Sequence, residues 1–192
     1  MNRNLFIRMW HTCRLYFILS ARKRADYLRK NKIFKNIGKN CTIMERKVPL
    51  YSKLISIGDN VHLASKVLLV THDIVHLCLN NMGNNGGVRE KIGCIDIGNN
   101  VFVGSNTTIL YDVKIGNNVI IGAGSLVCKD ITDNVVVAGV PAKIVGRFDD
   151  FVNIRINEKM YPDYFKIRGH EINIDLENWC WEDFYKKRKN NE

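Results

Sequence analysis

From Ile97 to Thr132, apolar residues recur at every sixth position. Cut at that period, the segment reads IGNNVF, VGSNTT, ILYDVK, IGNNVI, IGAGSL and VCKDIT. The first residue of each hexad is Ile or Val, the second is Gly in four hexads, and the fifth is small or β-branched. This period fits neither an amphipathic helix nor an alternating strand. A short fixed repeat of this kind predicts a parallel β-helix, and the fold class is therefore mainly β.

The hexad also predicts a local structure. Each hexad is expected to supply one short strand and one turn, and the side chains at positions one and five point into the core. Gly and Asn at positions two to four are expected to adopt the positive φ of tight turns. Three hexads make one triangular coil, whose strands pair in parallel with those of the next coil.

Three earlier fragments fit the same template: IGKNCT from Ile37, IGDNVH from Ile57 and LASKVL from Leu63. About two extra residues within 49–56 interrupt the register between them. Between His72 and Ile95 the pattern is lost in a segment rich in Asn and Gly. We expect a loop over 73–95 that projects from one corner of the prism, and such loops commonly carry function.

The flanking segments follow other patterns. Residues 3–30 read as a helix in which Phe6, Trp10, Cys13 and Phe17 recur at spacings of three and four. We expect this aromatic stripe to pack on the main domain, and a basic interfacial membrane helix is the alternative. After Pro141 the repeats end, and short helices are expected over 149–159 and 179–189. The predicted organisation is an N-terminal helical segment (1–34), a β-helix domain (35–147) and a C-terminal extension (148–192).

Composition narrows the class of protein without naming a partner. Apolar residues make up 46% and charged residues 25%, as in globular proteins. The formal net charge of +10 favours an anionic partner: nucleic acid, a membrane surface or a phosphorylated small molecule. Six scattered cysteines without a Cys-x-x-Cys pair are typical of a reducing compartment. Charged residues interrupt the apolar stretch 5–19, so we expect a cytoplasmic protein, with the inner face of the membrane as an alternative location.

The hexads are followed by VVVAGVPAKIVG at residues 135–146. This combination, over residues 37–147, resembles the hexapeptide-repeat acyltransferases. The preceding segment VPLYSKLISIGDN and the THD sequence resemble their sugar and capsular-polysaccharide O-acetyltransferase branch. The resemblance implies a left-handed parallel β-helix, acetyl-CoA as the donor substrate, a carbohydrate acceptor of capsule or O-antigen type, and a homotrimer with active sites between subunits.

The resemblance also implies an assignment for the catalytic base. O-acetyl transfer needs a base for the hydroxyl proton, and histidine suits this role because its pKa lies near neutrality. In LLVTHDIVH, the position of the family's base is His72. His76 is expected to bind the acceptor, to orient His72 or to have no role, while Asp73 or a backbone carbonyl would fix the His72 tautomer. Phe102 stands where many relatives carry Trp, so an aromatic wall is kept.

The same resemblance places the donor along the coils. Small residues would let its pantetheine arm approach the backbone, cations would bind its phosphates, and a final turn would meet its adenine end. The residues implied are Gly104, Ser105, Gly122, Ala123, Cys128, Lys129, Gly139, Pro141, Lys143 and Arg147.

Three other functions compete with this interpretation. A xenobiotic acetyltransferase would share the donor site, but the loop here lacks an aromatic-rich acceptor segment. A noncatalytic zinc-binding β-helix would need three grouped histidines, for which His62, His72 and His76 are available, although no metal is expected. Nucleic-acid binding is not expected, because no motif of interleaved aromatic and basic residues is present.

Overall fold

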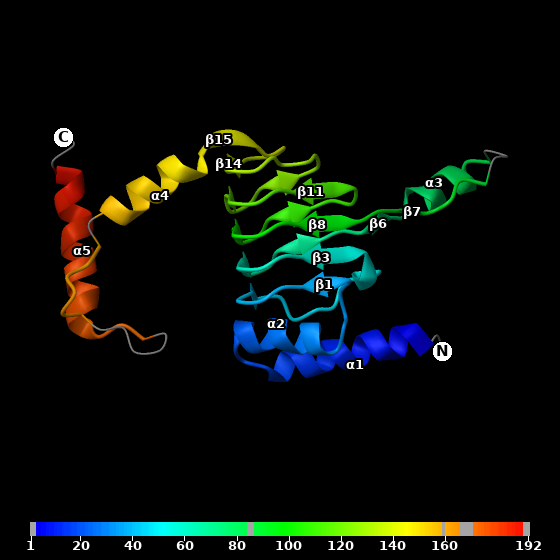
Figure 1. Ribbon diagram of the computed structural model, residues 1–192, viewed down its shortest axis with the longest axis horizontal. Coiled ribbons are helices and arrows are strands. Elements are labelled where there is room, and N and C mark those ends of the chain that lie inside the picture. Colours follow the sequence, from blue (N-terminus) through cyan, green and yellow to red (C-terminus); the bar gives the residue numbers. More distant parts are fainter. Residues whose placement is uncertain (1–2, 84–86, 159, 166–170, 190–192) are drawn as a thin grey trace. The chain divides into compact units, whose positions relative to one another are not determined.

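The computed structural model describes residues 3–83, 87–158, 160–165 and 171–189. His170 and residues 84–86 of the expected loop therefore lie outside the described residues. The chain divides into two compact units, Met1–Val152 and Asn153–Glu192. The first unit contains all the repeats and, as Figure 1 shows, is a stack of coils with an arm on one side.

Three sheets of stacked strands form the faces of the prism. The first face contains β1 (Asn36–Ile37), β3 (Ile55–Ile57), β8 (Ile95–Ile97) and β11 (Val113–Ile115). The second contains β2 (Thr42–Ile43), β4 (Val61–Leu63), β9 (Val101–Val103), β12 (Val119–Ile121), β14 (Val135–Ala138) and β15 (Lys143–Arg147). The third contains β5 (Leu68–Leu69), β10 (Thr108–Ile109) and β13 (Leu126–Val127).

The strand register confirms the predicted parallel β-helix. Asp96 pairs with Lys114, eighteen residues later, so one coil holds three hexads. Asn36 pairs with Ser56, twenty residues later, which confirms the two-residue excess. These extra residues follow β2, where the chain forms the short helix η1 (Ser52–Leu54). All pairs within the faces are parallel except β14 with β15, which is antiparallel and forms the last strand pair of the second face.

The core is built from positions one and five of each hexad, as predicted. Ile97, Val101, Val103, Thr107 and Ile109 are all at most 1% exposed. Their equivalents in neighbouring coils stack on them, so each coil removes apolar surface from water against the next. The buried Thr107 hydroxyl donates to the carbonyl of Gly122 at 3.1 Å, which satisfies the one polar group in this set.

The corners correct one expectation. Positive φ occurs at position four, at Asn100, Asn106 and Asn118, with values of 55–60°. Positions two and three do not adopt it, so the expectation was wrong for both. A Cβ added at Gly98 would lie 2.7 Å from the carbonyl oxygen of Gly116, and glycine is needed because the next coil approaches so closely.

A ladder of asparagine side chains ties the same corner together. Nδ2 of each residue donates to Oδ1 of the next, from Asn60 to Asn100, Asn118 and Asn134, at 2.9, 2.9 and 2.8 Å. Asparagine suits this position because it tolerates the left-handed conformation and offers both a donor and an acceptor.

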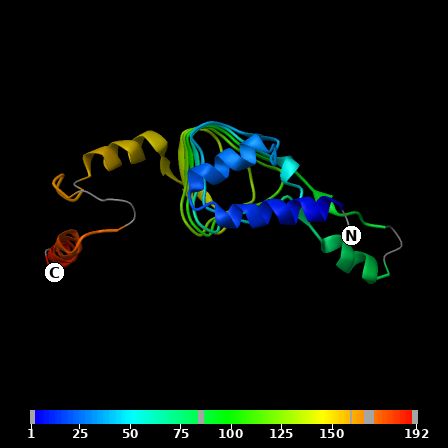
Figure 2. The ribbon, with the colours of Figure 1, turned by 90° about the horizontal axis from the view of Figure 1, so that it is seen from below.

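The N-terminal segment is two helices, not the single helix expected. They are α1 (Arg3–Phe17) and α2 (Ala21–Lys30). The Ser20 hydroxyl caps α2, and the buried Arg24 guanidinium donates to the carbonyls of Ile18 and Leu19 at 2.7 and 2.9 Å. These contacts satisfy the carbonyls after α1 and so stabilise the break. Helix α2 packs on β1 and β2 at one end of the prism (Figure 2).

The expected packing of the aromatic stripe is also wrong. Phe6, Trp10 and Phe17 are 57%, 56% and 80% exposed. The opposite side of α1 meets the domain through Leu15, which is buried, and through the polar Thr12, whose hydroxyl accepts from the amide of Val48 at 3.2 Å. Among its described side chains, α1 therefore contributes Leu15 to the core, while α2 packs on the first strands of the prism.

In its described residues, the segment expected as a loop forms a strand pair and a helix; we define residues 72–92 as the arm. Its root is an antiparallel pair of β6 (His72–Asp73) and β7 (Lys91–Ile92), and α3 (Val75–Asn81) follows β6. The structure assigns no buried residue to α3. The arm therefore projects from the prism without contributing to its core (Figure 1).

The second unit contains α5 (Ile174–Lys189), and α4 (Phe148–Asn157) crosses the boundary between the units. Helix α5 begins five residues before the expected Trp179, while α4 lies close to its predicted range. Leu176 is buried within this unit, and the ring of Phe165 lies 6.4 Å from that of Trp179. Among the described helices, none is long and apolar enough to cross a bilayer.

Candidate active site

His72 lies at the root of the arm, immediately after the third face turns toward the first. The ring of Tyr51 meets it edge-on, with centroids 5.3 Å apart and an interplanar angle of 90°. The Nδ1 atom of His72 is enclosed and has no hydrogen-bond partner among the described residues. Nε2 is therefore the ring nitrogen that can reach a ligand.

Asp73, the next residue, anchors the arm to the prism. One carboxylate oxygen accepts from the hydroxyl of Tyr111 at 2.5 Å, and the other accepts from the amide of Val75 at 3.1 Å. The Tyr111 hydrogen bond, followed by that of Val75, lowers the pKa of Asp73, because both bonds favour the carboxylate. The same bond raises the pKa of Tyr111. Because Nδ1 of His72 has no partner among the described residues, Asp73 does not fix the tautomer through that nitrogen.

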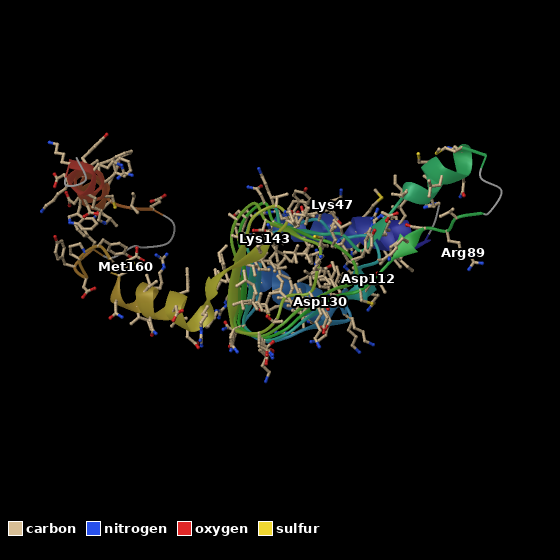
Figure 3. All side chains as sticks on the ribbon, turned by 90° about the horizontal axis from the view of Figure 1, so that it is seen from above. Lys47, Arg89, Asp112, Asp130, Lys143 and Met160 are labelled. Carbon is tan, nitrogen blue, oxygen red and sulfur yellow. The ribbon has the colours of Figure 1, made fainter. Side chains whose placement is uncertain are left out.

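Two further contacts brace the root of the arm. The hydroxyl of Tyr51 donates to Glu90 at 2.8 Å, and the Lys91 ammonium pairs with Asp112 at 3.3 Å. Figure 3 shows Asp112 at the prism beside the arm's root and Arg89 farther out along the arm. Tyr51 and Tyr111 were not predicted. Tyr111 is the third residue of its hexad, and no other hexad of the 97–132 run has an aromatic residue at that position. This departure from the repeat was the feature of the sequence that could have indicated a role for Tyr111.

His76 lies on α3 near the same anchor. Its charge contributes to the lowered pKa of Asp73, and its Nδ1 is also enclosed without a partner among the described residues. The structure thus brings together three of the predicted residues, His72, Asp73 and His76.

A groove of about 530 Å³ extends from α1 to His72. Its walls are mostly apolar, and four charged residues interrupt them: Arg8, Glu45, Lys47 and Lys66. The apolar wall comes from both helices and from the segments around β2 and β5, and it includes Leu15, Leu28, Phe34, Val48, Leu50, Leu68 and Val70. The groove borders β5, on the face to which the first coil contributes no strand.

The residues predicted to bind the pantetheine arm lie at another corner. Gly104 and Ser105 form the turn between β9 and β10, and Gly122 and Ala123 form the same turn one coil later. The amide of Gly124 donates to the carbonyl of Ser105 at 2.8 Å, so these turns stack directly. His72 lies at the next corner around the prism, and a single chain does not bring it together with this set.

Phe102 lies apart from His72 as well. It is the middle residue of β9 on the second face, and its side chain is 45% exposed. The structure therefore places the expected aromatic wall outside the groove of its own chain.

The remaining predicted residues gather toward the last coils. Cys128 and Lys129 line a cavity of about 120 Å³ near the end of the prism. Gly139 adopts a φ of 100° in the turn that carries Pro141. Lys143 lies at the start of β15, and Arg147, at its end, forms an exposed ion pair with Asp149 at 3.8 Å.

The three histidines of the zinc alternative do not form one group, because His62 lies apart from His72 and His76. His62 lies on β4, where its ring bonds to Thr42 at 2.9 Å and to Asn60 at 3.0 Å. Within the described ranges, no three His, Cys, Asp or Glu side chains are grouped to hold a metal ion. All six cysteines are free.

Comparison with known proteins identifies the repeats. The model of the bacterial transferase hexapeptide family (six repeats) matches residues 95–129. Protein CapG of Staphylococcus aureus is 40% identical over 141 residues, which cover 69% of this chain and 74% of CapG. The galactoside O-acetyltransferase of Escherichia coli K12 is 45% identical over 97 residues, which cover 50% of this chain and 45% of that protein.

A solved structure matches the fold of nearly the whole chain. The structure of a galactoside acetyltransferase in complex with coenzyme A matches with a TM-score of 0.50 and 28% identity, covering 88% of this chain and 92% of that one. The repeat, the coil architecture and these relatives agree, and the chain belongs to the hexapeptide-repeat acetyltransferase family.

Proposed function

We propose that this protein transfers an acetyl group from acetyl-CoA to a hydroxyl of a sugar in a capsule or O-antigen type polysaccharide, with His72 as the general base. One observation carries the proposal. His72 stands where the arm leaves the prism and lines a groove, and its enclosed Nδ1 leaves Nε2 as the proposed reactive nitrogen. A relative that is 45% identical over 97 residues, half of this chain, is a galactoside O-acetyltransferase, which supports a sugar acceptor.

The chemistry follows from the orientation of His72. Nε2 accepts the proton of the acceptor hydroxyl as its oxygen bonds to the acetyl carbonyl carbon. The carbon–sulfur bond then breaks, and the imidazolium returns the proton to the leaving thiolate. The backbone N–H of Ser105 is the proposed donor to the carbonyl oxygen as it gains negative charge. Atoms and protons balance, and His72 is regenerated.

The donor is proposed to lie along the corner of Gly104, Ser105, Gly122 and Ala123. Small residues there let a ligand approach the main chain. Of the three predicted phosphate ligands, Lys129 and Lys143 lie near the end of the prism, and Arg147 would exchange its exposed partner Asp149 for phosphate. A solved neighbour in complex with coenzyme A supports this class of donor.

The separation of the two corners supports a homotrimer. His72 and the donor corner lie apart within one chain, so a site between copies would combine the base of one with the donor corner of another. Phe102 would then face a neighbour's groove as an acceptor wall, opposite Asp73 and His76. The left-handed coil implied by the family resemblance is part of the same proposal.

The test is acetyl transfer by the full chain. Purified protein, acetyl-CoA and a panel of mono- and oligosaccharides are combined, CoA is followed with a thiol reagent, and acetylated products are identified by mass spectrometry. Acceptor-dependent CoA release with an O-acetylated sugar is the expected result. Transfer only to hydroxylated antibiotics would instead establish the xenobiotic alternative, and absence of any transfer would contradict the proposal.

A further inference from the structure

Helix α1 turns its apolar side away from the protein. Phe6, Trp10, Cys13 and Phe17 form one stripe, and all four are exposed. Met9 and Tyr16 widen it at 58% exposure each. The side that meets the domain carries Arg8, His11 and Thr12, with one buried apolar residue, Leu15. Most of the apolar side chains of α1, including its aromatic residues, thus face outward, whereas a surface helix usually packs them on the core.

The chain's positive charge is concentrated at the same end. Residues 1–35 contain ten Lys and Arg residues and one acidic residue, Asp26, which is a net charge of +9 out of +10 for the whole chain. Helix α1 itself contains no acidic residue. The Arg14 guanidinium lies 5.9 Å from the Trp10 ring centroid, so a cation borders the apolar stripe directly. This combination attracts a surface that is both apolar and anionic.

We propose that α1 docks on an anionic lipid bilayer, with its aromatic stripe inserted at the interface and the surrounding cations on the lipid headgroups. Trp and Tyr favour this depth, because their rings are apolar and carry a polar group. Insertion removes the stripe from water, and the cations add electrostatic attraction. A nucleic acid would use the cations but would not remove a stripe of this width from water.

A second copy of the chain is the competing occupant of the stripe. The charge argues against it, because symmetric contact would bring two segments of net charge +9 together. The two occupants can be distinguished by experiment. A bilayer makes binding depend on lipid, whereas a second copy makes the molecular mass of the protein depend on the stripe.

The experiment is flotation of the full chain with vesicles of phosphatidylcholine and phosphatidylglycerol at 7:3, and with vesicles of phosphatidylcholine alone. The variant is Trp10→Ser with Phe17→Ser. The matched control is Trp181→Ser with Phe184→Ser, because these residues of α5 are also exposed, at 53% and 40%. Circular dichroism and light scattering follow folding and mass. Both variants are expected to fold, since they change exposed side chains.

The wild type and the α5 control are expected to float with the anionic vesicles, and the α1 variant to lose about tenfold or more in binding, from two lost apolar insertions. Binding to neutral vesicles is expected to be weaker. Equal flotation of both double variants, loss only in the α5 control, or no flotation of the wild type would overturn the proposal. A lower molecular mass for the α1 variant would also overturn it, because the stripe would then lie between copies.

Discussion

At the scale of single residues, the candidate site depends on how its base is held. His72 is enclosed on its Nδ1 side and contacts the ring of Tyr51, while Asp73 beside it is bonded to Tyr111. Two tyrosines from different coils thus fix the strand that carries the base. Because proton transfer depends on position, this bracing is as relevant to the proposed reaction as the imidazole itself.

Replacing Tyr111 by Phe is expected to raise the pKa of Asp73 toward its ordinary value, because the largest cause of its lowering is the Tyr111 hydrogen bond. Carbon NMR of the Asp73 carboxyl group, followed against pH, measures this. Tyr51→Phe is the matched control, since it removes a hydroxyl bonded to Glu90 and should leave the titration unchanged. An unaltered Asp73 pKa in Tyr111→Phe would contradict the anchoring role.

The lowered pKa also sets the sign of a pH effect. A depressed carboxyl pKa stabilises the folded arm at pH values above the unfolded pKa, and this contribution is lost as pH falls through the folded pKa. The protection of the arm's amides from hydrogen exchange is therefore expected to stay constant near neutral pH, where Asp73 is ionised. It is expected to weaken only in strong acid, where Asp73 becomes protonated. Loss of the anchor near neutral pH would contradict this sign.

The sequence singled out His72 as the candidate base, but it did not predict the residues that hold it in place. His72 stands where the hexad pattern breaks, and the family resemblance points to the same position. Tyr111 contacts Asp73 across thirty-eight residues, and this pairing depends on the exact length of the arm. Periodicity gives the coil on which a residue lies, but it does not give contacts across an insertion.

At the scale of elements, the hexad accounts for the strands, the core and the corners. Its inward positions were predicted correctly because burial repeats with the same period as the sequence. The role of position two was not predicted correctly. A glycine required by close approach of the next coil recurs with the same period as a glycine required by a turn, so the sequence pattern does not distinguish the two. The orientation of α1 was mispredicted because an apolar stripe usually faces the core, whereas here α2 covers the prism.

The corner ladder gives a stability prediction. Asn100→Ala is expected to destabilise the protein by about 2 kcal/mol, because it loses side-chain hydrogen bonds and strains a residue at φ 56°. Asn100→Gly should cost less, since it relieves the backbone strain. Urea unfolding measures both. Asn81→Ala, at an exposed position of α3, is the control and should change stability by less than about 0.5 kcal/mol. Equal effects of all three would refute the role of the ladder.

The arm is expected to be separable from the stability of the prism. Replacing residues 75–90 by a short Gly-Ser turn should leave the melting temperature within about 3 °C of the wild type, because α3 buries no residue. Acetyl transfer should fall sharply, since His76 and the bond between Tyr51 and Glu90 are lost. Calorimetry and the CoA-release assay measure the two effects. A large loss of stability would show that the arm belongs to the core.

At the scale of the whole molecule, the proposed site would combine residues from more than one chain. The base and the donor corner stand at different corners of the prism. The exposed Phe102 lies at neither of these corners, because it belongs to the second face of the prism. The sequence predicted each part, but their separation became apparent only from the coil geometry.

Mixed oligomers test this division. Ala123 is exposed at the donor corner, so Ala123→Trp should block the donor without disturbing the core. Neither His72→Asn nor Ala123→Trp alone should be active. Coexpressed in equal amounts, the two variants should recover about a quarter of wild-type activity. Each site needs an intact His72 from one chain and an intact donor corner from its neighbour, and random mixing supplies each of these in about half of the cases. No recovery would place both halves in one chain.

The most direct test of the central claim is the turnover number of His72→Asn at saturating acetyl-CoA with the best saccharide acceptor. We expect it to fall by about 10²–10⁴-fold, the contribution of a general base, with CoA affinity retained. His11→Asn, a histidine of α1 bonded to Tyr27, should keep turnover close to the wild type. Normal turnover in a folded His72→Asn protein would contradict the assignment of His72 as the base.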